Sequence, residues 1–190
     1  MLFNIPTLLT WLRIILIPLF TAIFYFPEAW FSFPWQNRFA TLLFVVAAAT
    51  DWLDGYLARR WNETSAFGAF LDPVADKLMV ATALILLVHL GRLDAVLAVI
   101  IIGREIAISA LREWMAQIGA HKNVAVSMVG KIKTTAQMVA IPLLLYHDTF
   151  ADIDIQRVGT WLIYVAAVLT LWSMGYYMRM AWPHLTRGGR

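Results

Sequence analysis

Six long apolar runs divide this chain, and the segments between them hold most of the proline, glycine and charge. Each run approaches the roughly 20 residues that a helix needs to cross a bilayer. The pattern predicts an all-α chain with helices over 8–27, 39–58, 70–90, 93–115, 126–147 and 157–178. Because proline interrupts helical hydrogen bonding, Pro6 and Pro18 predict that the first element is a short interfacial piece followed by a span.

The composition is that of a membrane protein. Of the 190 residues, 61% are hydrophobic and 14% charged, whereas soluble domains carry roughly 45–50% apolar and about 25% charged residues. Six spans leave little chain over, and neither a repeat nor a flexible linker divides it. We therefore expect a polytopic membrane protein with six transmembrane helices, in which residues 1–190 form a single transmembrane domain.

The net charge of +3 is modest. In a membrane protein, basic residues report topology and contacts with anionic lipids, so we expect membrane lipids as partners and no nucleic acid. The basic residues gather in alternate connections and in the C-terminal tail. The positive-inside rule places both termini and the loops 59–69 and 116–130 in the cytoplasm. It places the loops 27–37, 91–93 and 148–156 on the outer side.

Four aspartates lie close together in the second and third runs, namely Asp51, Asp54, Asp72 and Asp76. Their spacings of three and four residues put each pair on one face of a helix. The polar segment 60–67 turns the chain so that the two pairs face each other. A single aspartate at a helix end is usually a cap or a solvated charge, but four carboxylates in apolar sequence repel one another unless a cation neutralises them.

The chain has no cysteine, and oxygen ligands alone suit Mg²⁺, with Mn²⁺ as a substitute. Small residues on the same side of the motif, Gly55, Ala58 and Gly68, let a nucleotide approach the backbone, and Arg59 is placed to meet a phosphate. Taken alone, these glycines fit helix packing equally well, and Arg59 fits a topological charge. Lys77 is interpreted as a topological charge outside the site. The joint spacing indicates metal-dependent phosphoryl transfer.

The pattern D-x2-D-G-x2-A-R-x8-G-x3-D-x3-D is complete, with Asp51 first and Asp76 last. It resembles the signature of the CDP-alcohol phosphotransferase family. The resemblance implies the CDP-alcohol phosphotransferase fold, a homodimer, and displacement of CMP from a CDP-linked lipid or alcohol. It also implies that the four aspartates hold two divalent ions, Mg²⁺ or Mn²⁺, and that Asp76 is the general base.

The segments 4–13, 104–114 and 130–134 extend the resemblance over nearly the whole chain, to the branch of bacterial phosphatidylglycerophosphate synthases. This implies an enzyme of the bacterial inner membrane, with its active site facing the cytoplasm. CDP-diacylglycerol would be the donor, sn-glycerol 3-phosphate the acceptor, and phosphatidylglycerophosphate and CMP the products. By the same analogy, Thr10 and Arg13 help to close the CDP-diacylglycerol site, although a polar pair at a helix start is the plain alternative.

A phosphorylated acceptor needs a cationic pocket, and the charges available on the fourth and fifth runs are Arg104, Arg112, Lys131 and Lys133. Arg104 lies deep in an apolar run, so we expect an anionic partner, which is Glu105, an aspartate or a substrate phosphate. Arg104 and Arg112 share a helix side. Lys131 and Lys133 do not share a helix side, and we favour Lys131 as the lysine that faces the site. The alternatives are a structural ion pair for Arg104, interfacial snorkelling for Arg112, and a topological charge for either lysine.

Two other functions are compatible with parts of the pattern. The same fold could use another acceptor, such as phosphatidylglycerol in a cardiolipin synthase or an inositol phosphate. A cation-coupled or proton-coupled transporter also carries intramembrane carboxylates, but it predicts repeated halves and broken helices. The aspartates here lie in one part of the chain without a repeat, which favours the transferase.

Overall fold

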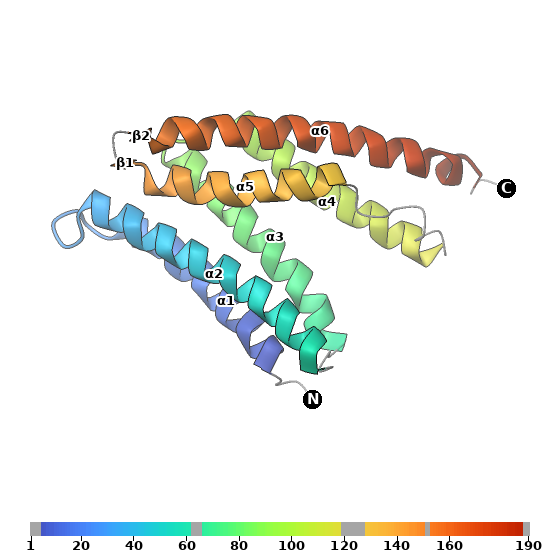
Figure 1. Ribbon diagram of the computed structural model, residues 1–190, viewed down its shortest axis with the longest axis horizontal. Coiled ribbons are helices and arrows are strands. Elements are labelled where there is room, and N and C mark those ends of the chain that lie inside the picture. Colours follow the sequence, from blue (N-terminus) through green and yellow to red (C-terminus); the bar gives the residue numbers. More distant parts are fainter. Residues whose placement is uncertain (1–4, 62–65, 119–127, 151–152, 188–190) are drawn as a thin grey trace.

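The computed structural model describes residues 5–61, 66–118, 128–150 and 153–187. Six α-helices make up most of this described part of the chain (Figure 1). They are α1 (Ile5–Ala22), α2 (Phe33–Trp61), α3 (Ala66–His89), α4 (Ala95–Gln117), α5 (Met128–Tyr146) and α6 (Ile155–Arg187). The all-α expectation is confirmed, and each helix overlaps one of the six predicted runs.

Two short elements complete the described structure. A single 3₁₀ turn, η1 (Ile23–Tyr25), follows α1. The strands β1 (Thr149–Phe150) and β2 (Ile153–Asp154) pair in antiparallel fashion between α5 and α6, with Thr149 opposite Asp154. Strands of two residues have no hydrophobic period, so the sequence pattern did not predict them.

The helices form two packed groups, which are joined by direct packing of α2 on α5 and by α3 (Figure 1). Helices α1 and α2 lie side by side, and α5 and α6 lie side by side across the molecule from them. Helix α3 crosses between the groups and contacts α1, α4 and α5, while α4 packs on α6. Because α3 carries two of the four aspartates, this crossing brings them towards both groups.

The interior is apolar, and so is much of the outer surface. Buried side chains from all six helices form the core, including Phe20, Phe44, Leu84, Ile101, Ile141 and Ile163. Large apolar side chains nevertheless point outward along all six helices; examples are Leu8, Leu42, Phe70, Val99, Val139 and Trp172. A surface this apolar is unusual for a soluble monomer and fits contact with lipid.

Among the described helices, two contain stretches that are long and apolar enough to cross a membrane, Leu8–Tyr25 and Ile155–Trp182. The expectation of a membrane protein is thus supported by two helices, while the structure does not establish six spans.

The first helix corrects one expectation. Helix α1 runs without a break from Ile5 to Ala22 and includes Pro18, so the prediction of a short piece followed by a span was wrong. Pro6 lies in the first helical turn, where its missing N–H has no intrahelical partner to lose. Packing of α1 on both α2 and α3 stabilises the helix through Pro18, which removes only one backbone hydrogen bond.

Three connections meet at one end of the molecule. The buried guanidinium of Arg92, between α3 and α4, donates to Asn37 Oδ1 at 2.7 Å and to the carbonyl oxygen of Leu145 at 2.7 Å. Arg38 and Asp148 form an ion pair at 3.7 Å across the same end. The connections that the charge pattern places on one common side therefore lie together in space.

Candidate functional site

Three of the four aspartates gather around α1. Thr10 Oγ1 donates a hydrogen bond to Asp72 Oδ1 at 2.5 Å. Arg13 NH1 lies 2.7 Å from Asp51 Oδ1 and 3.5 Å from Asp76 Oδ1. Asp51 comes from α2, and Asp72 and Asp76 come from α3, so side chains of two helices converge on one turn of a third.

The fourth aspartate, Asp54, lies in α2 one turn after Asp51, and its side chain is outside the described set. The same holds for the side chains of Ala58 and Arg59, and Gly55 lies beside them in α2. Gly68 is buried near the start of α3. The predicted roles of these four residues in nucleotide binding therefore stay predictions.

Arg13 and Thr10 are both completely buried, whereas the side chains of Asp51 and Asp76 keep 34% and 40% of their surface exposed. The buried guanidinium offsets the repulsion between these carboxylates, which would otherwise disfavour their ionised forms. Asp76 Oδ1 is buried and accepts no hydrogen bond from the described residues beyond its 3.5 Å ion-pair contact with Arg13, so it has lone-pair capacity for a further cation.

The donor chemistry of this cluster fits a hard divalent cation, because every acidic ligand offered is an oxygen. Among the described side chains, no three acidic, histidine or cysteine residues lie close enough to form a metal-binding group. That set lacks Asp54. The described carboxylates are instead held by Thr10 and Arg13.

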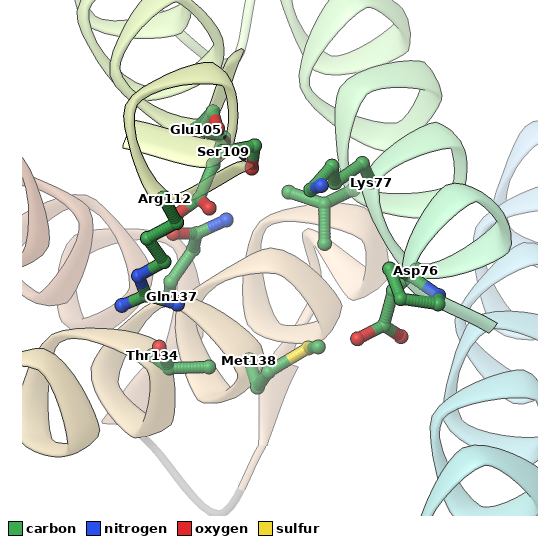
Figure 2. Close-up of a pocket in the computed structure, with 10 residues that line it drawn as sticks. Asp76, Lys77, Glu105, Ser109, Arg112, Thr134, Gln137 and Met138 are labelled. Atoms are coloured by element: carbon green, nitrogen blue, oxygen red, sulfur yellow. Dashed lines mark hydrogen bonds between the residues drawn. The ribbon is translucent and has the colours of Figure 1, made fainter. Parts of the chain in front are cut away.

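A pocket of about 390 Å³ opens beside Asp76, between α3, α4 and α5 (Figure 2). Its lining consists of Pro73, Asp76, Lys77, Val80, Glu105, Ser109, Arg112, Thr134, Gln137 and Met138. Asp76 and Lys77 come from α3 and face Glu105, Ser109 and Arg112 of α4 across the space (Figure 2). The volume and the polar lining suit a small, charged molecule that meets a carboxylate at one end and a guanidinium at the other.

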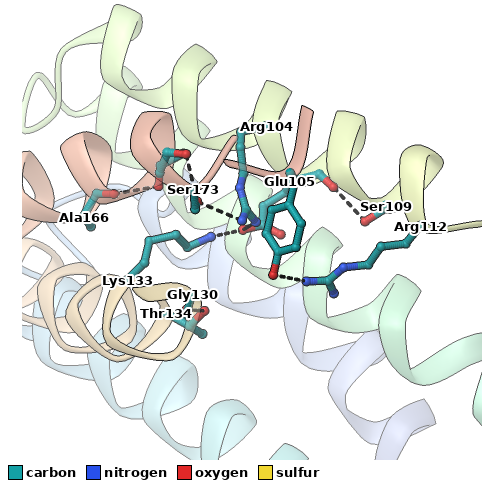
Figure 3. A network of polar contacts seen from close by, with 11 residues as sticks. Arg104, Glu105, Ser109, Arg112, Gly130, Lys133, Thr134, Ala166 and Ser173 are labelled. Atoms are coloured by element: carbon teal, nitrogen blue, oxygen red, sulfur yellow. Dashed lines mark hydrogen bonds and ion pairs between the residues drawn. The ribbon is translucent and has the colours of Figure 1, made fainter. Parts of the chain in front are cut away.

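Both arginines predicted to bind the acceptor phosphate, Arg104 and Arg112, lie on α4 (Figure 3). Arg104 is buried, and its NH1 lies 3.4 Å from Glu105 Oε1 while its NH2 donates to Ser173 Oγ at 3.0 Å. Of the anionic partners expected for Arg104, the structure selects Glu105. Arg112 lines the pocket and donates to the hydroxyl of Tyr177 at 3.2 Å.

Lys133 is buried and forms an ion pair with Glu105, which joins α5 to α4 (Figure 3). The side chain of Lys131 is outside the described set, so the preference for Lys131 stays a prediction. Lys77 corrects a second expectation, because it lines the pocket rather than standing outside the site.

Sequence reasoning also missed the neutral polar residues of the pocket. Ser109 lies four residues after Glu105, and Gln137 four residues after Lys133, so each shares a helix face with a charged residue. That spacing was the available signal. It could not be used without knowing which faces of α4 and α5 meet, since neutral polar residues occur on many faces.

Comparison with known proteins identifies the family. The family model described as CDP-alcohol phosphatidyltransferase matches residues 3–172. Proteins named CDP-diacylglycerol–glycerol-3-phosphate 3-phosphatidyltransferase, from Shigella flexneri serotype 5b and Escherichia coli K12, are each 55% identical over 181 residues. The alignment covers 94% of this chain and 95% of each relative. The resemblance carried by the aspartate motif is thereby confirmed, and the chain belongs to the CDP-alcohol phosphatidyltransferase family.

Proposed function

We propose that this chain transfers the phosphatidyl group from CDP-diacylglycerol to sn-glycerol 3-phosphate, giving phosphatidylglycerophosphate and CMP. The observation that carries the proposal is 55% identity, over 94% of the chain, to enzymes named for this donor and this acceptor. The pocket supports it, because a carboxylate and a guanidinium line the same space. This reaction is the committed step towards phosphatidylglycerol and cardiolipin in phospholipid biosynthesis.

The reaction replaces the phosphoanhydride bond of the donor pyrophosphate with a phosphate ester bond. A hydroxyl oxygen of glycerol 3-phosphate attacks the phosphorus that bears the diacylglycerol, and the bond from this phosphorus to the CMP oxygen breaks. The hydroxyl proton passes to Asp76, which lines the pocket with a partly exposed carboxylate. CMP leaves with the electron pair of the broken bond, so charge and atoms balance.

Asp51, Asp54, Asp72 and Asp76 would together hold two divalent ions, Mg²⁺ or Mn²⁺. When bound, such ions neutralise the oxygens of the donor pyrophosphate and of the leaving phosphate. The buried side chains of Thr10 and Arg13 orient this set, because Thr10 fixes Asp72 and Arg13 bridges Asp51 and Asp76. Support for the metal set comes from the all-oxygen donors and from the open lone pairs of Asp76 Oδ1.

Each substrate has its own set of residues. Thr10, Arg13, Gly55, Ala58, Arg59 and Gly68 bind CDP-diacylglycerol. Arg104, Arg112, Lys131 and Lys133 bind the phosphate of the acceptor. Arg112 supports this assignment most directly, since its guanidinium lines the pocket opposite Asp76. Arginine also suits this role because its fork of N–H groups matches phosphate oxygens.

The chain is further proposed to be a single catalytic domain with six spans in the bacterial inner membrane, acting as a homodimer. The apolar outer surface of all six helices supports the multiple spans. The connections around Arg92 lie at the far end of α3 from Asp76, which supports an active site at the opposite, cytoplasmic side. Both termini are then cytoplasmic, in agreement with the positive-inside rule.

The test is an acceptor comparison with the purified full-length protein in detergent. CMP release from CDP-diacylglycerol is measured with sn-glycerol 3-phosphate, inositol phosphate or phosphatidylglycerol, each with and without Mg²⁺ or Mn²⁺. We expect metal-dependent release with glycerol 3-phosphate alone. Release with another acceptor instead would overturn the assigned acceptor, and no release with any acceptor would overturn the transferase.

A further inference from the structure

Glu105 separates the pocket from two buried cations (Figure 3). Its carboxylate lines the pocket, and its Oε1 pairs with Lys133 and lies 3.4 Å from Arg104 NH1. Lys133 is 1% exposed and Arg104 is 6% exposed, and neither is among the residues that line the pocket. An anion that enters the pocket therefore meets Glu105 before it reaches either cation.

The two cations have more donors than Glu105 satisfies. A lysine ammonium has three N–H donors and a guanidinium five. In the described structure, one carboxylate oxygen of Glu105 serves both groups. The Nε of Arg104 is buried with no hydrogen-bond partner among the described residues. Buried donors are normally paired, so this cluster has capacity for further acceptor oxygens.

The charges around the pocket also favour binding of an anion. Lys133 and Arg104 lie behind Glu105, and Lys77 and Arg112 line the pocket in front of it. Glu105 and Asp76 supply two negative charges against these four positive ones. A phosphate monoester carries about −1.5 to −2 charge at pH 7 and three strong acceptor oxygens. It would balance and hydrogen-bond the cations better than one carboxylate does.

We propose that Glu105 is an internal counter-ion of Lys133 and Arg104, and that the phosphate of the acceptor displaces it on binding. This inference rests on the proposed function, because it takes the acceptor to be a phosphate ester. Glu105 then acts as a specificity residue. An uncharged alcohol cannot displace a carboxylate from two cations, whereas a phosphate can, so the pocket discriminates in favour of phosphorylated acceptors.

The experiment compares Glu105→Gln with Glu113→Gln, which removes an exposed carboxylate from the same helix. The readouts are the KM for glycerol 3-phosphate and the inhibition constant of inorganic phosphate, a probe that does not react. For Glu105→Gln, both should fall by roughly tenfold, the size expected when a like charge is removed from beside a partly buried anion site. Glu113→Gln should leave both unchanged.

Two outcomes would overturn the inference. A higher KM with an unaltered phosphate inhibition constant would show that Glu105 binds the acceptor hydroxyls instead. Unchanged values of both would show a purely structural ion pair.

Should Glu105→Gln fail to fold, Glu105→Asp retains the charge and shortens its reach towards Lys133 by one methylene. It should lower the phosphate inhibition constant by a smaller factor, and no change or a rise would contradict the proposal. Wild-type CMP release with glycerol 3-phosphate is measured in parallel. Absence of CMP release by the wild-type protein would overturn the proposed function. If the wild-type protein does release CMP but the variant has an unaltered phosphate inhibition constant, only the inference about Glu105 would be overturned.

Discussion

Arg13 is a fully buried cation whose charge is balanced by carboxylates on two other helices. A guanidinium in such surroundings is unfavourable unless it is paired, and the carboxylates would repel one another without it. The site therefore contains its own positive charge, in addition to any metal. Thr10, one turn earlier on α1, fixes Asp72 in the same way through its hydroxyl.

Replacing Arg13 with methionine tests this role. Arg13→Met keeps much of the volume but leaves the partly exposed carboxylates of Asp51 and Asp76 without their cation, so we expect a loss of about 1–3 kcal/mol in the free energy of unfolding. Thermal unfolding in detergent and CMP release would both be measured. Arg13→Lys, which keeps the charge, should lose less stability and less CMP release than Arg13→Met. Wild-type stability in Arg13→Met would show that the ion pairs contribute nothing.

Asp76 is the proposed base, and its amide variant is the direct probe of that role. Asp76→Asn cannot accept the hydroxyl proton, so CMP release should fall by roughly 10²–10⁴-fold. Asp94→Asn is the matched control. Asp94 caps α4 by accepting a hydrogen bond at its Oδ1 from the N–H of Val96, at 2.7 Å, and asparagine caps helices equally well. Substantial CMP release by Asp76→Asn would show that Asp76 is not the general base.

At the scale of elements, the turn between α3 and α4 determines how these helices meet. Gly91 has a positive φ of 68°, and its N–H donates to the carbonyl of Val88 at 3.0 Å. The N–H of Arg92 donates to the carbonyl of Leu87 at 2.9 Å. These two bonds form a Schellman motif, which ends α3 and places Arg92. Burial lowers the pKa of the Arg92 guanidinium to about 10, so it stays charged at neutral pH while it ties the turn to α2 and α5.

Gly91→Ala should lower the free energy of unfolding by roughly 1–2 kcal/mol, because a Cβ is unfavourable at positive φ. Nothing lies within 4 Å of the added Cβ, so the cost is that of the backbone conformation alone. Gly103→Ala in α4 is the control, since its Cβ also meets nothing within 4 Å and its φ is not positive. The midpoint temperature of thermal unfolding should fall only for Gly91→Ala. An equal fall in both variants would show that the positive φ of Gly91 is not the cause.

The sequence predicted the six helices because each apolar run is long and strongly patterned. It misjudged α1, since the effect of Pro18 depends on packing against α2 and α3. The aspartates were found from their spacing within two helices. The pocket was not, because Lys77 and Gln137 come from different helices and meet only after those helices pack.

The choice between Lys131 and Lys133 illustrates the same limit. Helical geometry says that the two side chains diverge, but it does not say which face of α5 turns towards α4. The described structure turns Lys133 towards Glu105. Residue spacing thus identifies candidates within one helix, whereas contacts between helices are fixed by the complementary shapes of their surfaces.

For the whole molecule, we propose that this cluster of carboxylates and cations joins glycerol 3-phosphate to the phosphatidyl group of CDP-diacylglycerol. The most direct measurement follows ¹³C-labelled glycerol 3-phosphate into lipid by mass spectrometry, with CMP quantified in the same reaction. We expect one CMP for each labelled phosphatidylglycerophosphate, and loss of both products on chelation of divalent metal. CMP released together with unlabelled phosphatidic acid, or labelled lipid formed without divalent metal, would contradict it.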